Sequence, residues 1–320
     1  STPADDAPGF ATNSDIVLSF SEVVEKGTGN IVINKFIDPT LSNLWGVYVS
    51  EDSTTTFNSI TNGNNGSVYI TGGTSVDLNG ETNNGSTDIF ASKYSESGEH
   101  QWTELIGSSS SESGGGIVAG SDGSVYITGV TSGDLNGELN KGENDVFAIK
   151  LNEDGEQQWT QLFGSATSDI AGKISIGDDD SIYIIGNTWV NDGSDEFDGQ
   201  IKGVGLEHYT LDTFISKVNS NGEKQWTKLL GIFNADFGGN SDIHTGSDGS
   251  TYITYFDGSE YMSISKLDSD GEFVWTESLQ NFSIGYRANI AIGDDDSIFI
   301  AGSDPSNNPY ATNVVKYEIE

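Results

Sequence analysis

The chain of 320 residues contains no cysteine, so the fold uses no disulfide, thiolate metal site or cysteine nucleophile. It has only 13 lysine and arginine residues against 49 aspartate and glutamate residues, which gives a formal net charge of -36. Such a field repels nucleic acids and anionic membrane surfaces and attracts cations, so we expect no polyanionic partner. No apolar run is long enough to span a bilayer as a helix, so we expect no membrane insertion.

Histidine is also scarce. The three histidines, His100, His208 and His244, show no metal-ligand spacing, and no G-x-S-x-G elbow precedes a helical pattern. We therefore predict no catalytic residue. Aromatic side chains are plentiful by contrast, with 15 Phe, 12 Tyr and 6 Trp that recur at fixed spacings. Disordered acidic chains lack such spacing, so the pattern indicates a folded protein.

Four short strand patterns recur along most of the chain, separated by turns rich in Gly, Asn, Asp and Ser. Examples are GKISIG, SIYIIG, DVFAIK and WTQLFG, which we name the inner, tyrosine, lysine and tryptophan strands. Tryptophan marks the repeats at positions 45, 102, 159, 226 and 275. Four antiparallel strands in each unit of roughly 50 residues are typical of a β-propeller. We therefore predict an all-β protein, a β-propeller of four-stranded antiparallel blades.

The strand order inner, tyrosine, lysine, tryptophan sets the expected blades. They lie at about residues 57–106, 115–164, 172–231 and 241–280, with a last unit at 288–318. This last unit lacks a tryptophan strand, which the N-terminal Trp45 strand can supply to close the ring. The prediction is then five blades. Six blades stay the alternative, if residues 15–35 belong to a further, incomplete blade.

The repeats resemble the bacterial β-propeller repeat family, whose units carry YVTG, a GDLDGQ-type loop, DAF..K and W...GS in this order. Here the matching motifs cover roughly residues 41–317, and the resemblance implies the fold more than any activity. Nearer the N-terminus, SDIVLSFSEVVEKGTGNIVI resembles the opening of bacterial immunoglobulin-like surface-protein domains. We expect a linker plus a short β-hairpin extension over residues 1–40, an immunoglobulin-like remnant, and the propeller over 41–320.

Two loops between tyrosine and lysine strands repeat the sequence DLNGE and carry oxygen-bearing side chains at alternate positions. These residues are Asp77, Asn79, Glu81 and Asp88 in the first loop, and Asp134, Asn136, Glu138 and Asp145 in the second. Calcium takes six to eight oxygen ligands, so the spacing predicts calcium as a cofactor. A plain repeated turn explains the same spacing, and both interpretations stay open. Glu196, Asp198 and Gln200 form a degenerate third copy.

A second group of candidate residues concerns ligand binding. Glu112, Asp169 and Asp236 each follow a repeat tryptophan by ten residues, which predicts positions at the entrance of the central channel. There they could hold a cation or a sugar, and anchoring of a loop is the alternative. Trp189 and Tyr209 fall outside the aromatic register and are candidates for stacking on a glycan, with loop packing as the alternative.

These features favour a non-enzymatic, extracellular or cell-surface module within a larger surface protein. Its expected partner is a glycan or a protein surface, and its expected role is adhesion, glycan recognition or surface assembly. The alternative is a carbohydrate-active hydrolase that uses carboxylates at the central channel. A purely structural spacer is a third possibility.

Overall fold

A computed structural model of the chain describes residues 46, 49–50, 52–190, 196–201, 210–230, 241–256, 261–283, 288–293, 297–303 and 312–317. Within these ranges the regular secondary structure is almost entirely β-strand, and the single helical element is a 3-10 turn, η1 (Asn64–Gly66). The predicted all-β class is therefore confirmed. The predicted extension, residues 1–40, and Trp45 lie outside the described residues.

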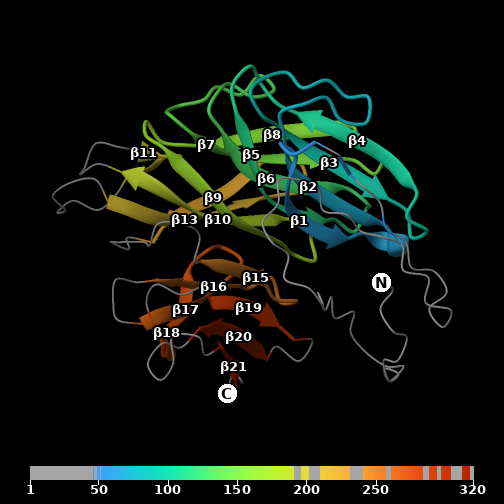
Figure 1. Ribbon diagram of the computed structural model, residues 1–320. Helices are drawn as coiled ribbons and strands as arrows, with labels where there is room; N and C mark the ends of the chain where they lie inside the picture. The colour runs from blue at the N-terminus through green and yellow to red at the C-terminus, as the bar shows by residue number, and fades with distance from the viewer. Residues whose placement is uncertain are drawn as a thin grey trace, which may run out of the picture.

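The strands form a series of antiparallel sheets that follow one another in chain order (Figure 1). The first sheet contains β1 (Thr56–Asn62), β2 (Val68–Thr74), β3 (Asp88–Tyr94) and β4 (His100–Ile106). The second contains β5 (Glu112–Ala119), β6 (Val125–Thr131), β7 (Asp145–Leu151) and β8 (Gln157–Phe163). The third contains β9 (Asp169–Ile176), β10 (Ile182–Val190), β13 (Thr210–Val218) and β14 (Lys224–Leu229).

Two further sheets complete the described part of the chain. The fourth contains β15 (Asp242–Thr245), β16 (Thr251–Phe256), β17 (Tyr261–Leu267) and β18 (Phe273–Ser283). The fifth has three strands, β19 (Ala288–Ile292), β20 (Ile298–Ser303) and β21 (Thr312–Tyr317). A small separate hairpin, β11 (Glu196–Phe197) with β12 (Gln200–Ile201), lies between β10 and β13 in the sequence.

The order of strands within each sheet confirms the predicted phase of the repeat. In the second sheet Tyr126 pairs with Lys150, and Lys150 pairs in turn with Trp159. The inner strands begin earlier than expected, at Glu112 and Asp169, because backbone pairing continues past the apolar residues. These two acids are therefore strand residues.

The hydrophobic core lies between consecutive sheets, and the second sheet buries side chains on both faces. Tyr126 packs with Ile182 and Phe214 of the third sheet, whereas its neighbour Ile127 packs with Ile89 of the first. This alternation follows from the two-residue period of a strand. The inner strands also lie beside one another from sheet to sheet. Sheets stacked face to face in this way form a β-propeller. A fifth blade completed by the Trp45 strand stays a prediction.

Candidate functional site

The two edges of the propeller differ in their connections. Because antiparallel strands alternate in direction, the loops between second and third strands share one edge with the links between consecutive sheets. We call this edge the variable rim, since the sequence between the second and third strands differs in length from sheet to sheet: residues 75–87, 132–144, 191–209, 257–260 and 304–311. The opposite edge, the turn rim, carries short turns closed by backbone hydrogen bonds, such as residues 120–124 and 152–156.

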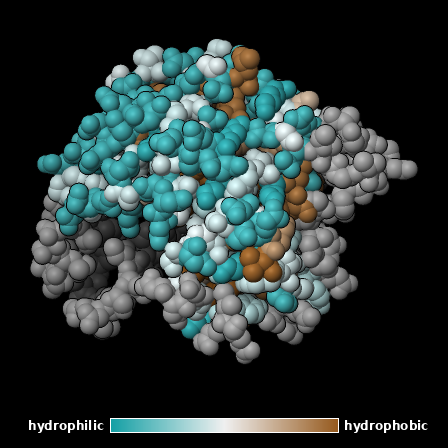
Figure 2. Space-filling model, turned by 180° about the vertical axis from the view of Figure 1, so that it is seen from behind, coloured by the Kyte–Doolittle hydropathy of each residue, from teal (hydrophilic) through white to brown (hydrophobic). Residues whose placement is uncertain are grey.

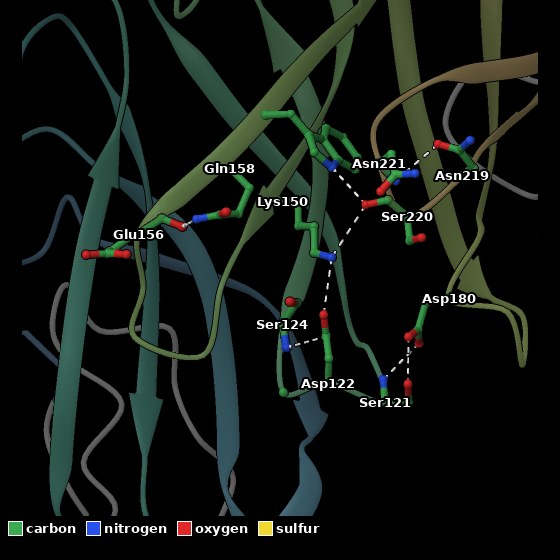
Figure 3. Close-up of polar contacts among 12 residues, drawn as sticks. Ser121, Asp122, Ser124, Lys150, Glu156, Gln158, Asp180, Asn219, Ser220 and Asn221 are labelled. Carbon is green, nitrogen blue, oxygen red and sulfur yellow. Dashed lines mark hydrogen bonds and ion pairs between the residues drawn. The ribbon is translucent and has the colours of Figure 1, made fainter.

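On the turn rim, lysine and tryptophan side chains bond each of the first three sheets to the sheet that follows it. Lys150 Nζ donates to the carbonyl oxygen of Ser220 at 3.4 Å (Figure 3). Trp159 Nε1 donates to the same oxygen at 3.2 Å. Lys150 also pairs with Asp122 at 3.3 Å. Equivalent bonds run from Trp102 to the carbonyl of Glu153 and from Trp226 to that of Ser269. These contacts form a regular frame.

On the variable rim, each DLNGE sequence folds as a two-residue hairpin turn. Asn79 and Gly80 have φ angles of 53° and 96°, and the backbones of Leu78 and Glu81 exchange hydrogen bonds of 3.0 and 2.9 Å. Such a turn needs positive φ at both central residues, which Asn-Gly adopts most easily. Residues 135–138 repeat this geometry. Each turn also buries its leucine: Leu78 is 4% exposed and Leu135 is 0% exposed.

The predicted calcium ligands of these loops point to different partners. Asp77 Oδ1 accepts the backbone N–H of Asn83 at 2.9 Å, while the Asn79 amide donates to the Thr103 hydroxyl at 2.8 Å. Asp134 and Asn136 make the corresponding bonds in the second loop. In the part of the chain that the structure describes, no group of three or more His, Asp or Glu side chains is placed to hold a metal. Calcium in these loops stays a prediction, and the plain turn accounts for the bonds present.

The third copy of the loop is the β11–β12 hairpin. Asp198 and Gly199 adopt the same positive φ angles, 48° and 84°, and Phe197 replaces leucine as the buried residue. Asp198 accepts a short hydrogen bond of 2.7 Å from Lys224 and a longer one of 3.3 Å from Lys141. In this copy the negative charge that a metal would need is therefore neutralised by two lysines.

Glu112 and Asp169 lie inside the protein. Each is 1% exposed. Glu112 accepts hydrogen bonds from the backbone N–H of Ser108 at 2.9 Å and from the hydroxyls of Ser108 and Thr131 at 2.7 and 2.8 Å. Asp169 accepts the backbone N–H and the hydroxyl of Ser165 at 2.8 and 3.1 Å. These bonds tie each acid to the loop that enters its own sheet.

The remaining candidates from the sequence are Trp189, Asp236 and Tyr209. Trp189 is a half-buried residue of β10 that pairs in the ladder with Leu211, and its carbonyl oxygen accepts from the Thr167 hydroxyl. Asp236 and Tyr209 lie outside the described residues. Binding roles for all of these residues stay predictions.

Glu112 and Asp169 each lie beside a buried aspartate of the preceding sheet. The Glu112 N–H donates to the carbonyl of Thr87, the residue before Asp88, and the Asp169 N–H donates to that of Asn144, the residue before Asp145. Burial raises the pKa of Asp88, and the Glu112 charge raises it further. Burial also raises the pKa of Asp145. It raises the pKa of Asp169 to about 7, with the Asp145 charge contributing.

Sequence reasoning missed these acid pairs because it assigned their members to separate groups. The sequence did contain a sign of the buried acids, because a glycine follows the tryptophan strand in both of these sheets. A Cβ atom on Gly107 would lie 2.1 Å from Asp88 Oδ1, and one on Gly164 would lie 2.2 Å from Asp145 Cγ. Glycine at these positions makes room for a buried carboxylate.

No family model matches the chain. Among curated proteins, the regulatory protein FlaEY of Caulobacter vibrioides is 29% identical over 141 residues, which cover 40% of this chain and 15% of that protein. The chain thus matches a small fraction of the length of this relative.

Solved structures resemble the chain in fold. The GH93 α-L-arabinofuranosidase of Fusarium graminearum gives a TM-score of 0.51 at 9% identity, over 85% of this chain and 82% of that one. A protein of unknown function from Dyadobacter fermentans gives a TM-score of 0.47 at 9% identity, over 83% and 84% of the two chains. At 9% identity the likeness to the arabinofuranosidase shows the fold alone.

The described segments include no helix long and apolar enough to cross a membrane.

Proposed function

We propose that this chain is a non-enzymatic propeller module of an extracellular or cell-surface protein, whose variable rim recognises a glycan or a protein surface in adhesion or surface assembly. The observation that carries the proposal is the contrast between the rims. On the turn rim the bonds between sheets repeat from unit to unit, whereas the loops of the variable rim differ in length. A constant frame with one variable edge suits recognition.

The buried carboxylates of the variable rim support a non-enzymatic role. Glu112, Asp145 and Asp169 are 1%, 0% and 1% exposed. A glycosidase needs two carboxyl groups that reach the sugar on either side of the scissile bond. These three carboxyl groups are instead enclosed between sheets, where they bond to neighbouring backbone and hydroxyl groups.

The exposed surface favours a neutral or cationic partner. The face shown in Figure 2 is mostly hydrophilic, with separate hydrophobic side chains. The net charge of -36 disfavours anionic ligands and supports binding of a neutral glycan or a basic protein. On the variable rim, Leu139 is 71% exposed beside the polar hairpin turn, which offers an apolar contact among hydrogen-bonding groups.

A module within a larger protein is supported by the match to FlaEY. The matched segment makes up 15% of that regulatory protein, so related sequence occurs as one part of a much longer chain. The proposal extends this arrangement to the present protein.

Binding to a panel of glycans and basic proteins tests the proposal, with two variants as probes. Leu139→Ala combined with Glu138→Gln alters the exposed hairpin of the variable rim, and Asp154→Asn alters an exposed turn on the opposite rim. We expect the first variant to weaken binding about tenfold, or about 1.4 kcal/mol, and the second to leave it unchanged, with equal melting temperatures. Loss of binding in the turn-rim variant alone would contradict the proposal. A chain that binds nothing on the panel would be a spacer.

A carbohydrate-active hydrolase is the second candidate, and one observation favours it. Burial raises the pKa of Asp169 to about 7, close to the neutral pH at which a general acid works best. Turnover of a glycan that is abolished by Asp169→Asn, at an unchanged melting temperature, would favour this candidate over the binding module.

A further inference from the structure

Two junctions between sheets on the variable rim share one construction. The first seam buries Asp88 of the first sheet with Glu112 of the second, and the second seam buries Asp145 of the second sheet with Asp169 of the third. All four side chains are between 0% and 1% exposed. In each seam a parallel bridge joins the residues just before the two acids, Thr87 with Ser111 and Asn144 with Ser168. The same pair of acids is thus placed twice by the same backbone contact.

One oxygen in each seam has no hydrogen-bond partner. Asp88 Oδ2 accepts the N–H of Asn84 at 2.7 Å, and Asp145 Oδ2 accepts that of Lys141 at 2.9 Å. The second oxygens, Asp88 Oδ1 and Asp145 Oδ1, are buried and have no partner. Leaving a buried charged oxygen unsatisfied is costly, so a group that these two oxygens can bind is expected.

The rest of each seam is rich in oxygen. Carbonyl oxygens of Ser108 and Ser110 lie 2.2 and 2.5 Å from where a Cβ on Gly85 would stand. Those of Thr167 and Ser165 lie 2.5 and 2.6 Å from the corresponding point on Gly142. Serine and threonine hydroxyls surround the second acid of each pair. Carboxylate, carbonyl and hydroxyl oxygens are the ligands that calcium takes.

Positive charge near the seams is limited. Around Asp88, the interactions that shift its pKa are burial, the N–H groups of Asn84 and Gly85, and the Glu112 charge, with no cation. Around Asp145, Lys141 and Lys224 contribute, but both ammonium groups are bonded to Asp198. Among the described residues no ion pair joins a lysine to Asp88 or Glu112, so the first seam buries two carboxyl groups without a neutralising side chain.

A proton shared between the two acids is the alternative to a bound cation. A proton removes only one of the two charges, whereas a divalent cation balances both carboxylates and gives the buried Asp88 Oδ1 and Asp145 Oδ1 a group to contact. A cation bound at about 2.3–2.6 Å holds its oxygen ligands farther apart than a hydrogen bond does. We propose that each seam binds a divalent cation of the calcium type between its two carboxylates, and so joins adjacent blades.

This proposal does not depend on what the variable rim recognises. It also differs from the predicted loop site. Asp88 and Asp145 belong to both ligand sets, whereas Glu112 and Asp169 belong to the seams alone, and Asp77 and Asp134 to the loops alone. Variants of these exclusive residues therefore separate the two sites.

The experiment uses the whole chain after removal of metals with a chelator. Three proteins are compared: wild type, the seam variant Glu112→Gln/Asp169→Asn, and the loop variant Asp77→Asn/Asp134→Asn. Differential scanning calorimetry gives the melting temperature of each with and without calcium. Isothermal titration calorimetry measures how each binds calcium. The amides in the seam variant keep their size and can donate to the hydroxyls of Ser108, Thr131 and Ser165, so the fold is expected to survive.

We expect wild type to bind at least two calcium ions and to melt about 5–10 °C higher at a calcium concentration about 100-fold above Kd. The loop variant keeps this rise. The seam variant loses it, and in chelator it melts no lower than wild type, because a buried charge has been removed from each seam. If wild type binds no calcium, or if the seam variant keeps the calcium-dependent rise, the proposal is wrong. Wild-type titration decides the first point even if a variant fails to fold.

Discussion

At the scale of single residues, two glycines leave room for a neighbouring buried side chain. Gly107 and Gly164 end the tryptophan strands WTELIG and WTQLFG, where a glycine is usually interpreted as a turn residue. Neither is among the described residues with positive φ. The carboxylates of Asp88 and Asp145 occupy the space that a side chain would need. Glycine is required at these two positions because it has no Cβ atom to collide with the carboxylate.

Gly164→Ala is therefore expected to lower the free energy of unfolding by about 1–3 kcal/mol, because the added methyl group collides with the Asp145 carboxylate. Urea unfolding measures the change. In an Asp145→Ala background, which removes the carboxylate, the same substitution is expected to cost much less. Equal costs in both backgrounds would show that the strain has another source. Gly137→Ala, at a φ of 91° with no atom within 4 Å, is the control for backbone strain alone.

At the scale of elements, the DLNGE loop acts as a hairpin that anchors an apolar side chain. Its Asn-Gly dipeptide sets the tight turn, and the buried Leu135 joins a core cluster that contains Ile106 of the first sheet and Leu162 of the second. Glu138, next in the hairpin, is exposed. The loop thus contributes to the contact between blades even without a metal.

Leu135→Ala is expected to lower the free energy of unfolding by about 2–5 kcal/mol through the cavity it leaves. Glu138→Gln is expected to change it by no more than about 0.5 kcal/mol, as at other surface positions. Both are measured by denaturant unfolding, in chelator and in calcium. A loss of stability in Glu138→Gln that occurs only with calcium would indicate a calcium ion in the loop.

At the scale of the whole molecule, stability depends on bonds that pass from each sheet to the next. A tryptophan of one sheet donates to a turn carbonyl of the following sheet in three consecutive cases, and the tyrosine beside it is buried. In the fifth sheet, Phe299 stands in the place of that tyrosine and is 38% exposed, against 1% for Tyr69. This difference agrees with a fifth sheet that takes a further strand.

Trp45→Ala tests whether the N-terminal strand closes the ring. If it does, the substitution is expected to lower the free energy of unfolding by about 3 kcal/mol, as for Trp102→Ala, because both indoles would bond to the next blade. Calorimetric melting measures both variants. Deletion of residues 1–40 is the control and should leave the melting temperature unchanged. A Trp45→Ala protein as stable as wild type would contradict closure by this strand.

Sequence alone determined the strand content and the phase of the repeat, because these follow from two-residue periodicity and turn residues that act locally. It also placed Asp88, Glu112, Asp145 and Asp169 among the candidates. Only the tertiary structure decided which of them meet. Each pair joins residues of different sheets, so their contact depends on how the blades stack, and no local spacing along the chain encodes it.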